Sequence, residues 1–150
     1  MYAIIYDEST FGITEKSLKM LRNTLAERID HRVAVVEVPT DQICCGFLVL
    51  DKDAQEAIFT GDGFRTDNGG EGGAGYKSAK ALLDVFGMPS IYWVAALDVW
   101  NAVASEEIPR EMWNVRHVTK ALTLLVDEIQ GSLKAEYYVK PADRTPAYLR

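Results

Sequence analysis

Short runs of β-branched and aromatic residues alternate with segments of helical periodicity in the first part of the chain. Met1–Tyr6, with the sequence MYAIIY, and Arg32–Val38, with the sequence RVAVVEV, are rich in residues that favour strands. Between them we expect an amphipathic helix of about four turns with Thr14 as its N-cap. Its apolar residues recur at three- and four-residue steps: Leu18, Leu21, Leu25 and Ile29. We expect the first strand to lie centrally in a sheet.

The hydrophobic pattern next predicts a β-hairpin. Phe47–Leu50 and Ala57–Thr60 are short apolar runs, and the polar segment Asp51–Glu56 separates them. The adjacent Cys44 and Cys45 precede this hairpin. Because neighbouring residues rarely reach disulfide geometry, we expect reduced thiols where a strand enters the core.

Two further helices are predicted. The first follows a glycine-rich stretch and ends near Gly87 and Pro89. Its apolar residues are Tyr76, Ala79, Leu82, Leu83 and Phe86. The second spans residues 108–130, with Pro109 as its first residue. Its apolar positions alternate steps of four and three: Ile108, Met112, Val115, Thr119, Leu122, Val126 and Ile129. This helix either packs on the sheet alone or also pairs with a second copy of itself.

The remaining segments complete a mixed sheet. Ile91–Leu97 is apolar on both faces, which predicts a central strand, and a short helix capped by Asp98 follows. Ala135–Val139 predicts a last strand, and residues 140–150 an arm. We therefore predict a single α/β domain over residues 1–150, with about five to six strands, a hairpin and three main helices. An α+β fold is the alternative.

Composition excludes several classes of protein. The 150 residues are 48% hydrophobic and 25% charged, which is typical of globular domains and unlike a disordered tail or a disulfide scaffold. No window has the roughly 18 uninterrupted apolar residues of a membrane span, and the N-terminus lacks a basic flank. We expect a cytoplasmic protein with no membrane partner. The net charge of −6 disfavours binding to long nucleic acids.

Glycine is concentrated in one stretch of the chain. Of 11 glycines, seven lie in residues 61–75, directly before a predicted helix. A glycine-rich loop at a helix start presents backbone amides together with the positive end of the helix dipole. This combination suits an anion, above all phosphate. Lys77 and Ser78, expected in the first helical turn, and Arg65, on the other side of the loop, would complete such a site.

Two named phosphate-binding patterns do not fit this stretch. A Walker A motif requires a glycine directly before its lysine, whereas Tyr76 stands between Gly75 and Lys77. The dinucleotide fingerprint matches Gly70–Gly75 but should follow its strand at once, and here about nine residues intervene after Thr60. The ligand class must therefore be judged from the surrounding side chains.

Aromatic residues near the glycines indicate a ligand with a flat ring. Phe64, which we expect to be exposed, and Tyr76 offer stacking surfaces, and Asn68 offers polar contacts. We predict a sensor or sequestering protein, without catalysis or a cofactor, that binds a small phosphorylated ligand of the nucleotide type. The predicted ligand-binding residues are Asp62, Phe64, Arg65, Asn68, Gly70, Glu71, Gly72, Gly73, Gly75, Tyr76, Lys77 and Ser78.

Two other functions remain open. Asp7, Asp62 and Glu71 offer oxygen ligands for a divalent metal if folding brings them together, which predicts a metal-dependent phosphoryl hydrolase or transferase. Alternatively, the glycines allow two chains to approach closely and the helix over 108–130 supplies the contact, which predicts a homo-oligomeric interaction module. The absence of a familiar housekeeping motif fits a protein of a virus or mobile element.

Overall fold

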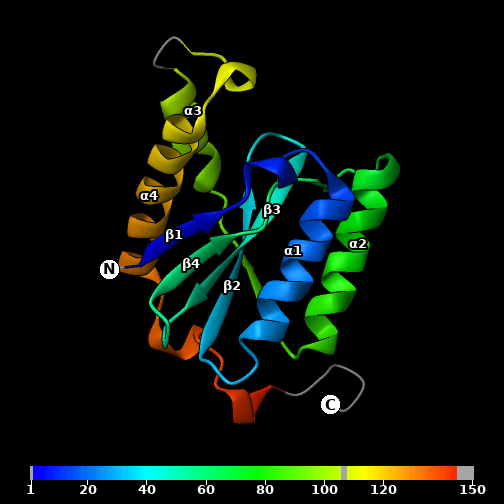
Figure 1. Ribbon diagram of the computed structural model, residues 1–150, viewed down its shortest axis with the longest axis vertical. Coiled ribbons are helices and arrows are strands. Elements are labelled where there is room, and N and C mark those ends of the chain that lie inside the picture. Colours follow the sequence, from blue (N-terminus) through cyan, green and yellow to red (C-terminus); the bar gives the residue numbers. More distant parts are fainter. Residues whose placement is uncertain (1, 106–107, 145–150) are drawn as a thin grey trace.

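The computed structural model describes residues 2–105 and 108–144, and its centre is a six-stranded mixed sheet (Figure 1). The strands are β1 (Ala3–Tyr6), β2 (Val33–Pro39), β3 (Cys44–Asp51), β4 (Glu56–Phe59), β5 (Phe64–Arg65) and β6 (Ser90–Tyr92). They lie in the order β1-β4-β3-β2-β6, and β5 pairs with β3. β1, β4, β2 and β6 run parallel to one another, whereas β3 runs antiparallel between β4 and β2. The predicted hairpin is confirmed as β3–β4.

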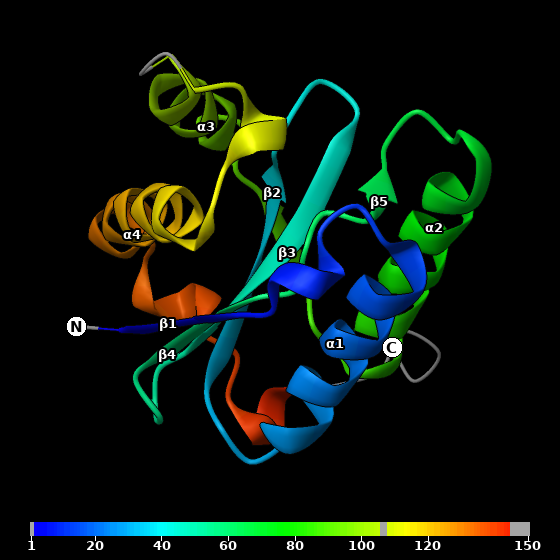
Figure 2. The ribbon, with the colours of Figure 1, turned by 45° about the horizontal axis from the view of Figure 1, so that its top comes forward.

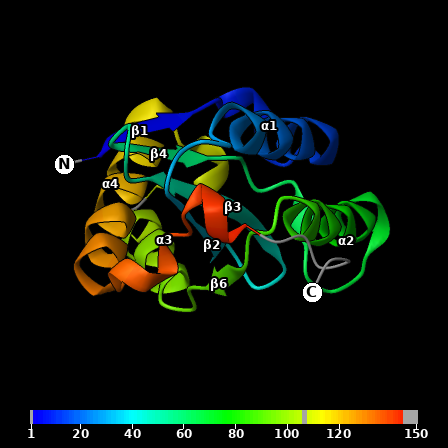
Figure 3. The same ribbon diagram turned by 90° about the horizontal axis from the view of Figure 1, so that it is seen from below.

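In the part of the chain that the structure describes, four α-helices cover the sheet, one more than the three main helices predicted. They are α1 (Thr14–Glu27), α2 (Gly70–Val85), α3 (Ala96–Ala104) and α4 (Val115–Ser132). α1 and α2 lie side by side on one face, and α3 and α4 cover the other (Figures 2 and 3). The predicted single α/β domain is therefore confirmed. Its helices and sheet form three layers. None of the helices in the described ranges is long and apolar enough to cross a membrane.

The strands hold the layers together because alternate residues enter two separate hydrophobic clusters. In β2, Val36 and Val38 belong to the cluster under α3 and α4, whereas Val33 and Val35 belong to the cluster under α1 and α2. Every residue of β2 is buried. Burial of each of these valine side chains contributes about 1.5 to 3 kcal/mol, so β2 anchors the fold.

Two strands that were predicted to be central lie at the edges of the sheet. Among the described residues, β1 pairs only with β4 and β6 only with β2. The predicted strand Ile91–Leu97 is wrong beyond Tyr92, where the chain turns and α3 begins two residues before Asp98. Tyr92 and Val94 are 53% and 71% exposed, so the apolar run at this edge is not covered on both faces.

The helix predicted over residues 108–130 begins later. Pro109 precedes a 3-10 turn over Arg110–Met112. Asn114 then caps α4, because its side chain accepts hydrogen bonds from two backbone amides in the first turn of the helix. The expected packing on the sheet is confirmed, since three of the predicted apolar positions are buried: Leu122, Val126 and Ile129. Pairing of α4 with a second copy stays a prediction.

Smaller differences occur at the two ends of the chain. α1 begins at Thr14 but has Ile13 as its N-cap, and Ile29 lies beyond the helix and is 55% exposed. The predicted strand Ala135–Val139 is wrong: its first three residues form a 3-10 turn, and a single bridge joins Val139 to Val33. The arm is described as far as residue 144, and residues 145–150 lie outside the described ranges.

A network of ion pairs around a buried carboxylate lies at the end of the sheet where β3 ends. The side chain of Asp51 is fully buried, and its carboxylate lies 3.0 Å from Arg28 Nε and 2.7 Å from His31 Nδ1. The Asp51 carboxylate also accepts a hydrogen bond from the backbone amide of Ala54. The hydrogen bond to Asp51 raises the pKa of His31 above its ordinary value of 6.5.

The raised pKa of His31 predicts a pH dependence of stability. The unfolded chain lacks this bond, so its contribution is fully present below the unfolded pKa and is lost as the pH rises through the folded one. We expect the free energy of unfolding in urea to fall as the pH rises above the ordinary pKa of histidine, and to fall less in His31→Gln. His117→Gln is the control, because His117 lies outside the network. Equal pH slopes for His31→Gln and the wild type would contradict this account.

Candidate functional site

A cleft of about 720 Å³ opens at the edge of the sheet where the parallel strands end. β2 leads into Thr40, and β4 leads through Gly61 into Asp62, and both polar residues line the cleft. The opposite wall comes from α3 and from the segment between α3 and α4, which carries Arg110. In open α/β sheets, ligands bind at the carboxyl ends of the parallel strands. The position of the cleft therefore makes it the first candidate for a binding site.

Asp62 and Arg110 form an ion pair in this cleft. Arg110 Nη2 donates to Asp62 Oδ2 at 2.6 Å, and Arg110 Nη1 donates to the carbonyl oxygen of Thr40 at 2.8 Å. The hydroxyl of Thr40 donates to Asp62 Oδ2 at 2.9 Å, and the amide of Gly12 donates to Asp62 Oδ1 at 2.9 Å. The Asp62 side chain is only 11% exposed. Charge-assisted hydrogen bonds of this kind hold both side chains in one orientation.

Two tryptophan rings support the guanidinium of Arg110. Its central carbon lies 4.9 Å from the ring centre of Trp100 and 5.7 Å from that of Trp113. The two indoles stack on each other, with centres 5.6 Å apart and planes at 27°. A cation over aromatic rings gains about 0.5 to 2 kcal/mol. Arg110 is thus oriented by two hydrogen bonds and two ring contacts before any ligand arrives.

The turn that carries Asp62 into the cleft depends on Gly61. Its φ of +91° is unfavourable for other residues, and a Cβ atom there would lie 2.3 Å from Thr10 Oγ1. Trp100 is placed by α3, where its side chain is buried, and Arg110 by the 3-10 turn before α4. Segments far apart in the sequence therefore meet in the cleft only through the fold.

The rim of the cleft carries negative charge. Glu8, Asp41 and Glu111 are exposed and line it, while the charge of Arg110 is balanced by Asp62. Two of the five N–H groups of Arg110 are used in its bonds to Thr40 and Asp62, which leaves donors for a ligand. The cleft thus combines aromatic surface and one oriented cation with a rim that repels large anions.

The structure corrects the position of the glycine-rich stretch. α2 begins at Gly70, so Gly70, Gly72, Gly73 and Gly75 lie in the helix and not in a loop before it. A Cβ atom on Gly73 would lie 2.4 Å from the backbone carbon of Asn68, and one on Gly75 would lie 2.1 Å from Thr14 Cγ2 of α1. Close packing of α2 therefore explains Gly73 and Gly75, whereas Gly70, where nothing lies within 4 Å of a Cβ atom, is explained by its φ of +55°.

The predicted charged partners of the glycines have other surroundings. Arg65 pairs with Asp67 at 2.6 Å, and its side chain lies against Gly72, where a Cβ atom would be 2.7 Å from Arg65 Cγ. Lys77 and Ser78 are exposed about two turns into α2, and not in its first turn as predicted. Glu71 is exposed in that first turn. Of the predicted ligand-binding residues, Asp62 alone lines the cleft.

The predicted stacking residues belong to the core. Phe64 is fully buried, edge-on to Phe47 at 5.5 Å between ring centres, so the expected exposure is wrong. Tyr76 is half-buried and stacks on Phe47, and its hydroxyl donates to Glu37 at 2.8 Å. Burial and this bond raise the pKa of Tyr76. Asn68, with a φ of +63°, forms the turn before α2.

The structure does not assemble the proposed carboxylate metal site. Asp7 accepts hydrogen bonds from the amide and hydroxyl of Ser9, Asp62 is engaged in the cleft, and Glu71 lies at the start of α2. The described residues contain no group of three or more His, Cys, Asp or Glu side chains that could hold a metal ion. Asp7, Asp62 and Glu71 therefore do not form a metal-binding cluster in the described part of the chain.

The two cysteines are free and lie at the start of β3, as expected. Burial, followed by the charge of Asp41, raises the pKa of Cys44 to about 11. Burial also raises the pKa of Cys45. Since the thiolate is the reactive form, neither side chain is activated as a nucleophile at neutral pH.

The sequence alone did not identify Arg110 or Trp100 as site residues. A weak signal was present, because two of the three tryptophans of the chain flank Arg110 within a short segment. Tryptophan and arginine are enriched at binding sites.

Comparison with known protein families, curated protein sequences and solved structures finds no significant match to this chain.

Proposed function

We propose that the protein binds a small phosphorylated ligand with a flat ring, of the nucleotide type, in the cleft at the carboxyl edge of the sheet. The observation that carries this proposal is the orientation of Arg110 by Asp62, Thr40 and the two tryptophan rings. The proposal keeps the ligand class expected from the sequence and moves its site from the glycine-rich stretch to the cleft.

The chemistry of the cleft matches the two parts of such a ligand. The ring would lie against the partly buried aromatic surface of Trp113 and Phe11, where stacking is worth about 1 to 3 kcal/mol per base. The phosphate would accept hydrogen bonds from the remaining N–H groups of Arg110. Because Arg110 is already held in place, little further side-chain entropy is lost on binding. The protein would act by holding its ligand, as a sensor or sequestering protein.

The acidic rim narrows the ligand class. Glu8, Asp41 and Glu111 repel negative charge that extends beyond Arg110. A ligand with one compact phosphate, such as a nucleoside monophosphate or a cyclic nucleotide, is therefore favoured over a triphosphate. A nucleoside without phosphate would lose its contacts to Arg110.

We expect Arg110→Ala to weaken binding of nucleotides by about tenfold to a hundredfold, because hydrogen bonds to charged groups contribute about 1.5 to 3 kcal/mol. The measurement is isothermal titration with 5′-monophosphates, 3′,5′-cyclic monophosphates and triphosphates, in buffer with a chelator. Arg65→Ala is the matched control, since Arg65 pairs with Asp67 outside the cleft. Wild-type protein that binds no member of this panel, or loss of binding in Arg65→Ala alone, would overturn the proposal.

A further inference from the structure

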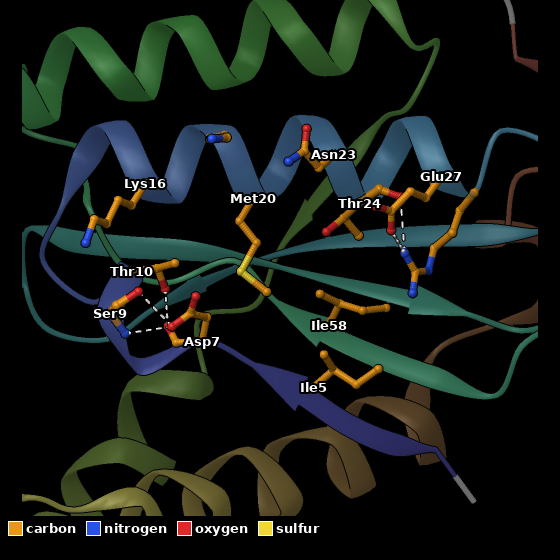
Figure 4. Close-up of a pocket in the computed structure, with 12 residues that line it drawn as sticks. Ile5, Asp7, Ser9, Thr10, Lys16, Met20, Asn23, Thr24, Glu27 and Ile58 are labelled. Carbon is orange, nitrogen blue, oxygen red and sulfur yellow. Dashed lines mark hydrogen bonds and ion pairs between the residues drawn. The ribbon is translucent and has the colours of Figure 1, made fainter.

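We propose that the groove between α1 and the β1–β4 pair is a second binding site, for a free amino acid whose large side chain carries one polar atom (Figure 4). The groove has a volume of about 470 Å³, and small-molecule sites usually have volumes of about 300 to 1,000 Å³. Among the described residues, none lines both this groove and the cleft that contains Arg110. The inference therefore does not rest on the proposed function.

The floor of the groove is apolar. Ile5 of β1 and Ile58 of β4 are register partners in the sheet, and both side chains point toward α1. Met20 reaches from α1 toward the sheet, on the same helix face as Lys16 and Thr24, which stand four residues before and after it. Methionine is flexible and fills gaps of irregular shape, so Met20 can adapt to a ligand. This floor suits a large and mainly apolar side chain.

The hydroxyl of Thr24 is unpaired in this groove. Thr24 is 4% exposed, and its side chain points from α1 toward the sheet (Figure 4). Threonine hydroxyls in helices can donate to the carbonyl four residues earlier, as Thr123 does to Thr119 at 2.7 Å. Within the described ranges the Thr24 hydroxyl has no hydrogen-bond partner. Because buried polar groups ordinarily have a partner, this hydroxyl points to a ligand with a polar atom over the apolar floor.

The end of the groove next to the start of α1 complements a zwitterion. Asp7, which directly follows β1, and Lys16 of α1 both lie at this end (Figure 4). Ser9 donates twice to Asp7 Oδ1, which leaves Oδ2 for an ammonium group. In the part of the chain that the structure describes, Asp7, Lys16 and Lys19 form no ion pair. The ammonium and carboxylate of a free amino acid stand on one carbon atom, so Asp7 can bind the first while Lys16 binds the second.

The opposite end of the groove carries charges that are already paired. Glu27 lies 3.5 Å from Arg28. Arg28 also pairs with Asp51 at 3.0 Å and with Glu56 at 2.9 Å. Charged groups without a partner of opposite sign are therefore found only at the Asp7 end of the described lining. This arrangement favours a ligand with both charges at one end over a peptide, whose terminal charges lie far apart, and over a ligand with a single charge.

The first test is titration of the wild-type protein with tyrosine and with three analogues, followed by the NMR signals of the backbone amides. Phenylalanine lacks the side-chain hydroxyl, tyramine lacks the carboxylate, and hydroxyphenylpropionate lacks the ammonium group. We expect saturable shifts with tyrosine at Ile5, Thr24 and Ile58, and at least about tenfold weaker binding of each analogue. No saturable shift with tyrosine, or equal binding of tyramine or hydroxyphenylpropionate, would overturn the proposal.

Thr24→Val tests the unpaired hydroxyl. Valine has a similar shape but cannot form a hydrogen bond, so this variant should bind tyrosine and phenylalanine equally. Thr123→Val on α4 is the matched control and should keep the preference for tyrosine, because Thr123 lies outside the groove. If Thr24→Val keeps the preference of the wild type, the hydroxyl does not contact the ligand and the assignment fails.

Two further variants test the charges. Lys16→Met should weaken binding of tyrosine by about tenfold and leave tyramine unaffected, and Lys77→Met, at an exposed position of α2, is its control. Asp7→Asn keeps an acceptor for Ser9 and should weaken binding of tyrosine but not of hydroxyphenylpropionate. Arg110→Ala should bind tyrosine as the wild type does. Loss of tyrosine binding in Arg110→Ala, or normal binding by both Lys16→Met and Asp7→Asn, would show that the amino acid does not bind in this groove.

Discussion

Replacement of Asp62 by alanine is expected to lower the free energy of unfolding by about 3 kcal/mol, because it leaves the partly buried guanidinium of Arg110 and the buried hydroxyl of Thr40 without the acceptor that they share. The Asp62 carboxylate accepts hydrogen bonds from Gly12, Thr40 and Arg110. Its loss also frees Arg110 to adopt other orientations over the tryptophan rings. We therefore expect nucleotide binding to be lost together with stability.

Asp67→Ala is the matched control for Asp62→Ala. Asp67 also pairs with an arginine, but its side chain is 38% exposed and that of Arg65 is 40% exposed. Exposed pairs contribute less than about 1 kcal/mol. Urea denaturation measures both variants, and nucleotide titration at a temperature where each remains folded measures binding. Similar stability losses in the two variants, or normal binding by Asp62→Ala, would contradict the role assigned to Asp62.

Gly73→Ala has the second large expected effect. Alanine in a helix is ordinarily about 1 kcal/mol more favourable than glycine. At Gly73 the new Cβ atom would lie 2.4 Å from the carbonyl carbon and 2.7 Å from the Cα atom of Asn68. Backbone atoms in a packed turn cannot move away at low cost, and overpacking costs about 1 to 3 kcal/mol. We expect a net destabilisation of up to about 2 kcal/mol, because the overpacking cost exceeds the gain in helix propensity.

Gly131→Ala is the control for the same substitution in an open position. Gly131 lies near the end of α4, and nothing lies within 4 Å of a Cβ atom built there. We expect this variant to be more stable than the wild type by up to about 1 kcal/mol. Thermal and urea unfolding should therefore move in opposite directions for the two variants. Stabilisation by Gly73→Ala would remove close packing as the explanation of the glycine-rich stretch.

Much of the fold could be predicted because it depends on local patterns. The strands over residues 33–39 and 56–59, the hairpin, and the apolar positions of α1 and α4 follow from the spacing of hydrophobic residues. The order of the strands could not be predicted in this way. β1 and β6 are apolar but lie at edges, and only the pairing of distant segments determines which strands are covered on both sides.

The candidate site was less predictable than the fold. Asp62 was predicted because it lies in the glycine-rich stretch, yet its partner Arg110 is 48 positions further along the chain. No local pattern connects the two. The glycines suggested a phosphate loop because close helix packing and ligand approach both require a residue without a side chain. Only the positions of Asn68 and Thr14 against Gly73 and Gly75 distinguish these explanations.

The central claim is that the ligand site is the cleft around Arg110 and not the amino end of α2. The most direct measurement is a crystal structure of the wild-type protein with the nucleoside monophosphate or cyclic nucleotide that binds best in titration. We predict density for the phosphate at Arg110 and for the ring against Trp113. Density at the first turn of α2, with the cleft unchanged, would contradict the account.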